Sequence, residues 1–220
     1  MPKAKVILAH ADGMNGDQVE KAMSRWAQNA FQRFRKKLKP WNFILVQEAD
    51  STLLVANLPQ NCRVWLVALW GHGRRRDGAF LDANGRQAVH RLNLNLLEDR
   101  NVCAFYCYSR KLYNTAVEAK WGKPQRFVGF RNSIWLVIQP SGTSYMGFEE
   151  SFETALSSIL YGHSAEFAAQ KFREESSRWI TYWGCNILLA AWEHRWNDAV
   201  FSLLCTFAFL NNINEVCGHD

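Results

Sequence analysis

Short apolar runs, separated by polar or turn-forming residues, dominate the first 140 residues of the chain. Runs of this length are too short for buried helices and are typical of strands that are buried on both faces, as in a parallel sheet. Strands are therefore expected within residues 5–11, 41–47, 63–70, 101–108 and 126–138. The run 126–138 is interrupted at 131–133, which predicts a fifth strand before the interruption and a sixth strand after it.

Apolar residues recur at intervals of three or four in other segments, which predicts amphipathic helices. Gly162 is placed to end one of these helices, and Ser164 is placed to cap the start of the next. The helices are expected at residues 17–38, 148–161 and 164–182.

A small hairpin is expected around Asn84-Gly85, because the apolar triplets 79–81 and 87–89 flank that turn dipeptide. We expect this hairpin to project from the edge of the sheet and a short helix to follow at 92–99.

Strands that alternate with helices indicate an α/β fold, a three-layer sandwich with a mostly parallel central sheet and helices on both faces. Since no repeat or low-complexity linker divides the chain, residues 1–220 are interpreted as a single domain.

Composition supports one substantial core, with 48% apolar and 14% aromatic residues. The net charge of +6 raises the question of nucleic-acid binding, and basic residues are densest at 33–39. That run ends a predicted helix, where cations complement the helix dipole. We therefore interpret it as a solvated helix end and expect no nucleic-acid partner.

The N-terminal residues lead directly into a short strand, without the long apolar stretch of a signal peptide, so a cytoplasmic location is expected. The most apolar stretch, Ala199–Leu210, is too short to span a bilayer and is interpreted as a buried helix, without membrane insertion. The six cysteines show no regular spacing, and most are expected to be buried thiols.

Two of the predicted strands end in residues with reactive side chains, His72 and Cys107. The carboxyl ends of neighbouring parallel strands meet at one edge of a sheet, so the imidazole and the thiol are expected to lie close together. A thiol is only slightly ionised at neutral pH, and a nearby imidazole can take its proton and later protonate a leaving amine. The backbone N–H groups of Gly73 and Cys107 would then form an oxyanion hole.

Other residues could form a different nucleophile, a metal site or a nucleotide-binding site. Cys103 lies four residues before Cys107 in the same strand, about 13 Å away, so only Cys107 occupies the strand end. The same distance excludes the two cysteines as ligands of one zinc ion. Cys217 and His219 are interpreted as part of an exposed, frayed terminus, and neither a metal nor a cofactor is expected. A dinucleotide fingerprint beginning at Gly71 fails because Arg76 stands where its third glycine belongs.

The two strand ends resemble the caspase-like superfamily of cysteine proteases, and within it the bacterial CHAT and caspase-like proteases. In that superfamily an apolar strand ends in a His-Gly pair, and the next core strand ends in the nucleophilic cysteine. Residues 66–73 (LVALWGHG) and 102–109 (VCAFYCYS) match this pattern, residues 127–130 look like the family's fifth strand, and the helix pair 147–161 and 164–183 looks like its C-terminal half.

The resemblance implies the caspase-hemoglobinase fold over residues 5–184, with a C-terminal helical extension at 185–220. It implies a cysteine endopeptidase in a bacterial defence or cell-death setting, which activates a partner such as a gasdermin-like pore former by cleavage. Phe105-Tyr106 precedes Cys107 where animal caspases have Gln-Ala, so their substrate preference does not carry over. Asp12 stands where metacaspases keep an acid that binds a basic P1 side chain, which predicts a substrate-binding role.

An alternative of another class is a catalytically inactive caspase-like module that binds partners through its tryptophans. Exposed tryptophans often anchor interfaces. The aromatic surface would then form around Trp179, Trp183, Trp192 and Trp196. A third hypothesis, nucleic-acid binding, would require affinity that falls steeply with rising salt.

Overall fold

A six-stranded sheet forms the centre of the molecule in the computed structural model, which describes residues 5–11, 18–38, 41–58, 64–138 and 147–220. The strand order is β2-β1-β3-β6-β7-β8; every neighbouring pair is parallel except β7 and β8. The strands are β1 (Lys5–His10), β2 (Asn42–Val46), β3 (Val64–Trp70), β6 (Asn101–Phe105), β7 (Arg126–Phe130) and β8 (Val216–His219). The predicted mostly parallel α/β fold is confirmed.

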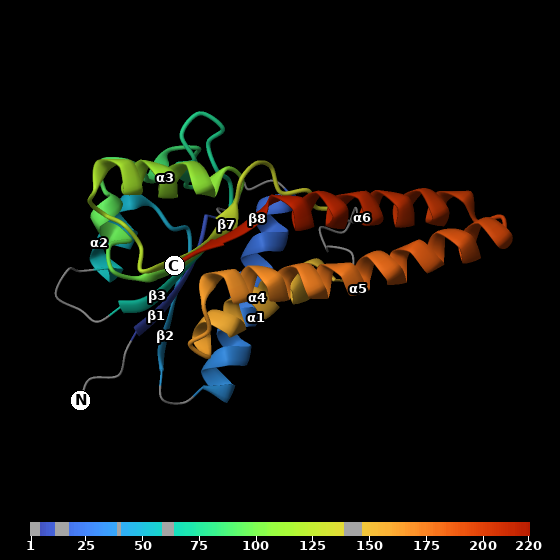
Figure 1. Ribbon diagram of the computed structural model, residues 1–220, viewed down its shortest axis with the longest axis horizontal. Helices are drawn as coiled ribbons and strands as arrows, with labels where there is room; N and C mark the ends of the chain where they lie inside the picture. The colour runs from blue at the N-terminus through green and yellow to red at the C-terminus, as the bar shows by residue number, and fades with distance from the viewer. Residues whose placement is uncertain (1–4, 12–17, 39–40, 59–63, 139–146) are drawn as a thin grey trace.

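Helices cover both faces of this sheet (Figure 1). One face carries α1 (Gln18–Lys37), α4 (Phe148–Leu160) and the first half of α5 (Ala165–Trp192). The other face carries α2 (Ser51–Asn57), the short helix η1 (Leu94–Leu96), α3 (Ser109–Ala119) and the hairpin of β4 (Phe80–Leu81) and β5 (Gln87–Val89). The arrangement is compatible with a three-layer sandwich.

Strand β3 shows why the apolar runs are continuous. Leu66, Ala68 and Trp70 point into the core under α1 and α4, whereas Val67 and Leu69 point into the core on the opposite face. Successive side chains of a strand alternate between faces, so a strand that is covered on both sides must be apolar at every position.

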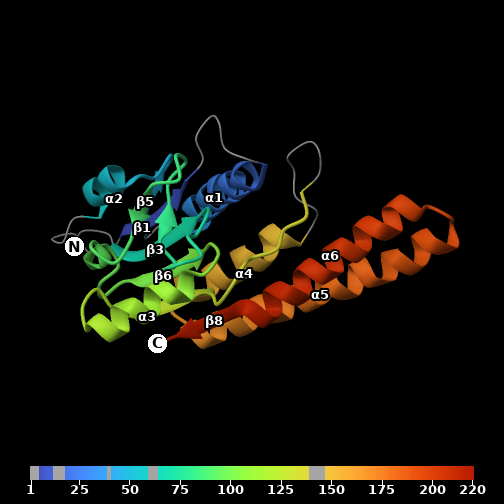
Figure 2. The ribbon, with the colours of Figure 1, turned by 90° about the horizontal axis from the view of Figure 1, so that it is seen from above.

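The second half of α5 and helix α6 (Trp196–Glu215) extend beyond the sheet as an antiparallel pair (Figures 1 and 2). We call residues 182–207, the outer part of this pair, the arm, and the rest of the molecule the body. At 1.5 Å per residue, the 28 residues of α5 are about 42 Å long. The expected boundary between residues 184 and 185 therefore falls inside one continuous helix.

Two predictions about the C-terminal part of the chain are wrong. Residues 134–138 form no strand, and the sixth strand is β8, which the chain reaches only after α6 returns from the arm. Residues 216–219 are accordingly not frayed: Cys217 is buried, and the ring of His219 stacks 4.7 Å from that of Tyr113. Pairing with β7 orders a tail that has little apolar pattern of its own.

Two further expectations need correction. The hairpin around Asn84-Gly85 forms as predicted, but it packs on the face of the sheet instead of projecting from its edge, since Phe80 is fully buried against Tyr106. The segment Ala199–Leu210 is helical but is not a buried helix. Several of its large apolar side chains are exposed: Val200, Phe201, Leu203, Leu204, Phe207 and Leu210.

Candidate active site

His72 and Cys107 follow adjacent parallel strands at the same level of the sheet. The last paired residues of β3 and β6 are Trp70 and Phe105, and each candidate lies two residues beyond its member of this pair. Neighbouring strands lie about 4.8 Å apart, so the two segments leave the sheet side by side. Both residues are half-buried. The structure thus brings the two predicted residues to one edge of the sheet.

Gly73 packs directly against the backbone of Cys107. A methyl group added at Gly73 would lie 1.8 Å from the carbonyl oxygen of Cys107 and 2.6 Å from the ring of Tyr106. Both neighbours are fixed, one as backbone and the other as a buried ring, so no larger side chain fits. The need for glycine here is therefore steric, and it holds the loop after β3 in contact with the cysteine.

The loop after His72 is tied back into a narrow ladder. The carbonyl of His72 accepts a hydrogen bond from the N–H of Leu81 at 3.0 Å, and Gly73 pairs with Phe80 in an antiparallel bridge. Arg74 forms an ion pair with Asp77, which raises the pKa of Arg74 and lowers that of Asp77. The hairpin thus fixes the backbone on the far side of the histidine.

The thiol of Cys107 is largely buried, with the backbone N–H of Ile134 beside it. Burial raises the pKa of this thiol above its usual range, which keeps the group protonated at neutral pH. The N–H of Ile134, 3.3 Å from Sγ, opposes that shift because it favours the thiolate. A base is therefore needed to generate the nucleophile.

The chain turns sharply straight after Cys107. Tyr108 adopts a left-handed conformation with a φ of 60°, which is unfavourable for a residue with a side chain. Helix α3 begins at the next residue, so its positive end lies beside the cysteine and favours a negative charge there. The hydroxyl of Ser109 donates to the carbonyl of Ala104 and accepts from the N–H of Phe130, which fixes the turn to β6 and β7.

Helix α6 holds the segment that supplies the Ile134 donor. The side chain of Asn212 accepts from the N–H of Trp135 at 2.9 Å and donates to the carbonyl of Trp135 at 2.8 Å. The neighbouring Asn211 donates to the carbonyl of Ser133 at 2.9 Å. No sequence motif marks these contacts, because they join residues about 77 positions apart.

The rival nucleophile lies away from this edge. Cys103 is fully buried inside β6, and burial raises the pKa of its thiol strongly. Asp12, the predicted substrate-binding residue, lies outside the described residues. In the described part of the chain, no group of three or more His, Cys, Asp or Glu side chains is arranged to hold a metal ion.

Within the described ranges, no helix combines the length and the apolar character needed to cross a membrane.

Comparison with known proteins adds no family to this description. No model of a protein family matches the chain, and the search of curated proteins finds no significant match. Function therefore has to be inferred from the residues and the geometry described above.

Proposed function

We propose that this protein is a cysteine endopeptidase of the caspase-hemoglobinase fold, with Cys107 as the nucleophile and His72 as the general base. The observation that carries the proposal is the placement of these two residues, each two positions beyond the paired ends of β3 and β6. The contact between Gly73 and the Cys107 backbone supports it, because it holds the two loops together. The mostly parallel sheet with helices on both faces is compatible with this fold.

The proposed reaction starts from the protonated thiol. The imidazole of His72 takes the proton from Sγ of Cys107, and the thiolate attacks the carbonyl carbon of the scissile peptide bond. The N–H groups of Gly73 and Cys107 donate to the oxyanion of the tetrahedral intermediate. The C–N bond then breaks, the imidazolium protonates the leaving amine, and a thioester remains on Cys107. Water, deprotonated by His72, hydrolyses the thioester and restores the thiol.

The environment of Cys107 suits this sequence of steps. Burial disfavours the resting thiolate, so the charge develops mainly when a base removes the proton. The Ile134 N–H and the start of α3 then stabilise the negative charge as it forms. The groups that stabilise the anion are already in place before the substrate binds, which is the condition for efficient electrostatic catalysis.

Thiol reactivity tests the proposal directly. The purified protein is treated with iodoacetamide at pH 7, and alkylation of each cysteine is followed by mass spectrometry. We expect Cys107 to react measurably and His72→Ala to lower its rate by about 100-fold. His90→Ala is the matched control, since His90 is also half-buried in the body but lies after β5. Equal rates in the wild-type protein and both variants would contradict the dyad.

Peptide cleavage tests the activity and its specificity. A positional peptide library should be cleaved by the wild-type protein and not by Cys107→Ala. If Asp12 recognises a basic P1 side chain, Arg or Lys should dominate at P1, and Asp12→Ala should erase that preference. Retained cleavage by Cys107→Ala would exclude this residue as the nucleophile.

The resemblance to bacterial CHAT and caspase-like proteases suggests the setting. The substrate would be a partner protein in defence or cell death, such as a gasdermin-like pore former that becomes active when it is cleaved.

A second candidate function is an inactive module that binds partners. The raised pKa of Cys107 and the exposure of two arm tryptophans favour it. Trp192 and Trp196 are exposed, whereas Trp183 is buried between the helices and Trp179 is packed against the core. Wild-type protein that reacts with iodoacetamide no faster than His72→Ala, and cleaves no peptide, would support this module.

A further inference from the structure

The arm exposes large apolar side chains on both of its helices. Trp192 is 85% exposed and Leu188 is 74% exposed. The arm's other exposed large apolar side chains are Tyr182, Leu189, Trp196, Val200, Phe201, Leu203, Leu204 and Phe207. A helix that is apolar around its whole circumference is normally buried, so this surface needs a covering partner.

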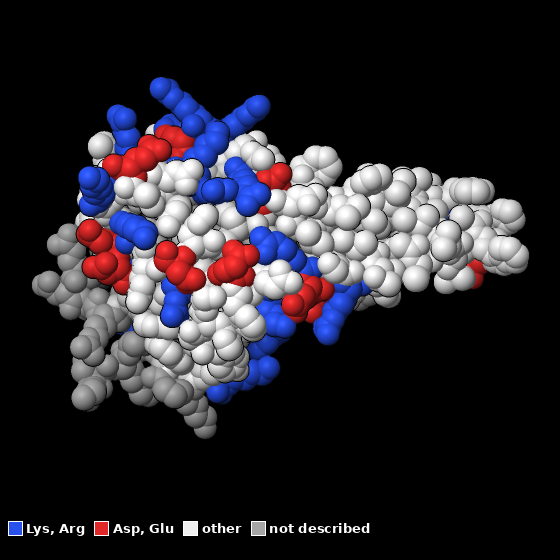
Figure 3. Space-filling view, in the orientation of Figure 1, with Lys and Arg blue, Asp and Glu red and all other residues white. Residues whose placement is uncertain are grey.

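Charge is absent from most of the same surface. No Asp, Glu, Lys or Arg occurs at 182–192 or 199–207, and the charged residues of the arm are confined to its tip. Figure 3 shows this contrast, with Lys, Arg, Asp and Glu gathered over the body and the visible side of the arm almost free of them. Two copies of such a surface approach each other without like-charge repulsion.

We propose that the arm is the dimerisation surface of this protein, and that it pairs with the arm of a second copy about a two-fold axis. The exposed side chains named above present about 1,000 Å² per copy, if a full large side chain contributes roughly 200 Å². When the second copy covers the exposed faces of both arm helices, the interface buries about 2,000 Å² in total, which is the size of a stable homodimer interface.

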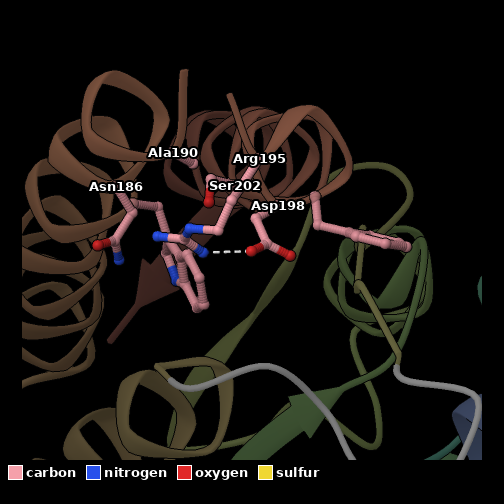
Figure 4. Close-up of a pocket in the computed structure, with 7 residues that line it drawn as sticks. Asn186, Ala190, Arg195, Asp198 and Ser202 are labelled. Carbon is pink, nitrogen blue, oxygen red and sulfur yellow. Dashed lines mark hydrogen bonds and ion pairs between the residues drawn. The ribbon is translucent and has the colours of Figure 1, made fainter. Parts of the chain in front are cut away.

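The arm also supplies a hollow to complement its protruding side chains. A crevice of about 250 Å³ lies between α5 and α6, lined by Trp183, Asn186, Ala190, Arg195, Asp198, Phe201 and Ser202 (Figure 4). In a two-fold interface the same patch meets itself, so a ridge on one copy needs a hollow on the other. A protruding side chain such as Trp192 of the second copy is the natural occupant.

The tip of the arm argues against a bilayer as the covering partner. Arg195 is hydrogen-bonded to Glu193 at 2.7 Å and forms an ion pair with Asp198, and these three residues would enter the membrane first. Burial of such a charged group in hydrocarbon is costly. In a pair of arms lying along each other, the Arg195–Asp198 ion pair lies beside the crevice and meets the second copy as a neutralised pair, and Glu193 remains in water.

Sedimentation velocity of the full chain tests the proposal. At about 50 μM the wild-type protein should sediment as a dimer of about 51 kDa, twice the chain mass of 25.4 kDa. The double variant with Leu188→Arg and Trp192→Arg should sediment as a monomer, with a dissociation constant raised at least about 100-fold. Both side chains are exposed, so circular dichroism and the melting temperature should show that the variant stays folded.

Leu92→Arg is the matched control, because Leu92 is 72% exposed but lies on the body. It should leave the dimer intact. Alkylation of Cys185, an exposed thiol on the arm, adds a second readout and should become faster when the arm variant separates the copies.

A monomeric wild-type protein at this concentration would overturn the proposal, and so would a dimer that survives the arm variant. Arm-dependent binding of a monomer to phosphatidylcholine–phosphatidylserine vesicles would replace the second copy with a lipid surface. The measurement can be repeated with Cys107→Ala, so its result does not depend on catalysis.

Discussion

The body and the arm bury their apolar side chains in opposite ways. In the body, Phe152 of α4 contacts the rings of Trp26, Phe105, Phe130 and Phe172, with centroids 5.1–5.9 Å apart, and most charged side chains face water. In the arm, the two helices pack on each other and leave their outer apolar side chains exposed. A helix buries an apolar stripe only where a second layer exists, and beyond the sheet each arm helix has only the other arm helix as that layer.

Helix α5 contains both kinds of surface in one continuous element. Its first half exposes charged residues that form ion pairs, such as Lys171 with Glu174 and Arg178 with Glu175. Its second half, from 179 to 192, contains no charged residue at all. The change falls where the helix leaves the body, which indicates that the two halves are adapted to different surroundings.

The two regions are not independent, because α6 connects them. The outer end of α6 lies in the arm, and its inner end holds the segment at Ser133–Trp135 beside Cys107 through Asn211 and Asn212. Rearrangement of the arm would therefore reach the candidate active site through two asparagine side chains.

The largest expected effect comes from a methyl group in the body, Gly73→Ala. Its Cβ would lie 1.8 Å from the Cys107 carbonyl oxygen, so the loop must move and the proposed oxyanion donors move with it. We expect kcat/KM for a cleaved peptide to fall about 100-fold or more, with a loss of about 1–3 kcal/mol in stability. Sedimentation should show an unchanged oligomeric state. Full activity would show that the close contact is not needed.

The link between arm and body is tested by Asn212→Ala. Asn212 is fully buried, and its loss leaves the N–H and C=O of Trp135 without their partner. The free energy of unfolding in urea should fall by about 1–3 kcal/mol. Alkylation of Cys107 should also slow, because the Ile134 donor loses its support.

Asn197→Ala on the exposed first turn of α6 is the control for this change. It should alter the free energy of unfolding by no more than about 0.5 kcal/mol. Equal effects of the two variants would mean that α6 does not position the loop beside Cys107.

A third, smaller effect concerns Glu153, which lies on α4 and forms an ion pair with Arg33 of α1. Burial raises the pKa of Glu153 to about 7, although Arg33 opposes the shift. The unfolded value is about 4.3, so the folded state binds the proton more tightly, and stability falls as pH rises from about 4.3 to 7. After allowance for solvent screening, this fall amounts to about 1–2 kcal/mol.

Glu153→Gln should remove this part of the pH dependence, because its amide does not titrate. Urea unfolding at several pH values between about 4.5 and 8 measures the slope. The exposed Glu118→Gln should leave the slope unchanged. An unaltered slope in Glu153→Gln would exclude Glu153 as its source.

The smallest expected effect is the same methyl group placed in the arm, Gly184→Ala. A Cβ at Gly184 meets no atom within 4 Å, and the residue lies in the interior of α5. Alanine favours a helix more than glycine does, so the melting transition should report about 0.5–1 kcal/mol of added stability. A loss of stability would indicate a contact on this side of the arm.

Local patterns predicted the elements whose surroundings are uniform along their length. The core strands appear as apolar runs because both of their faces are covered, and α1 and α4 keep one apolar stripe against the sheet. The run at 134–138 has the same apolar character, but Asn212 takes the backbone hydrogen bonds of Trp135. Strand β8 is four residues long, and its pairing depends on where α6 ends.

The candidate site also combines features that local sequence patterns predicted with features that they did not. The residue types at 72, 73 and 107, and their positions after apolar strands, could be read from the chain. Their proximity depends on β3 and β6 being neighbours, and 30 residues of chain separate Trp70 from Asn101 without specifying that order. The Ile134 donor and its support by Asn212 carry no local signal, since a backbone N–H is present at almost every residue.

The sequence by itself determined an α/β architecture, the approximate extents of five core strands and of helices α1 and α4, and a histidine and a cysteine at two strand ends. These features depend on side-chain periodicity, which is a local property of the chain. Only the tertiary structure decided that the two strand ends are adjacent, that Gly73 touches the Cys107 backbone, and that the apolar C-terminal helices lie outside the core. The physical reason is that adjacency and burial depend on contacts between distant segments, and the same apolar helix pattern fits a buried core helix or an exposed interface.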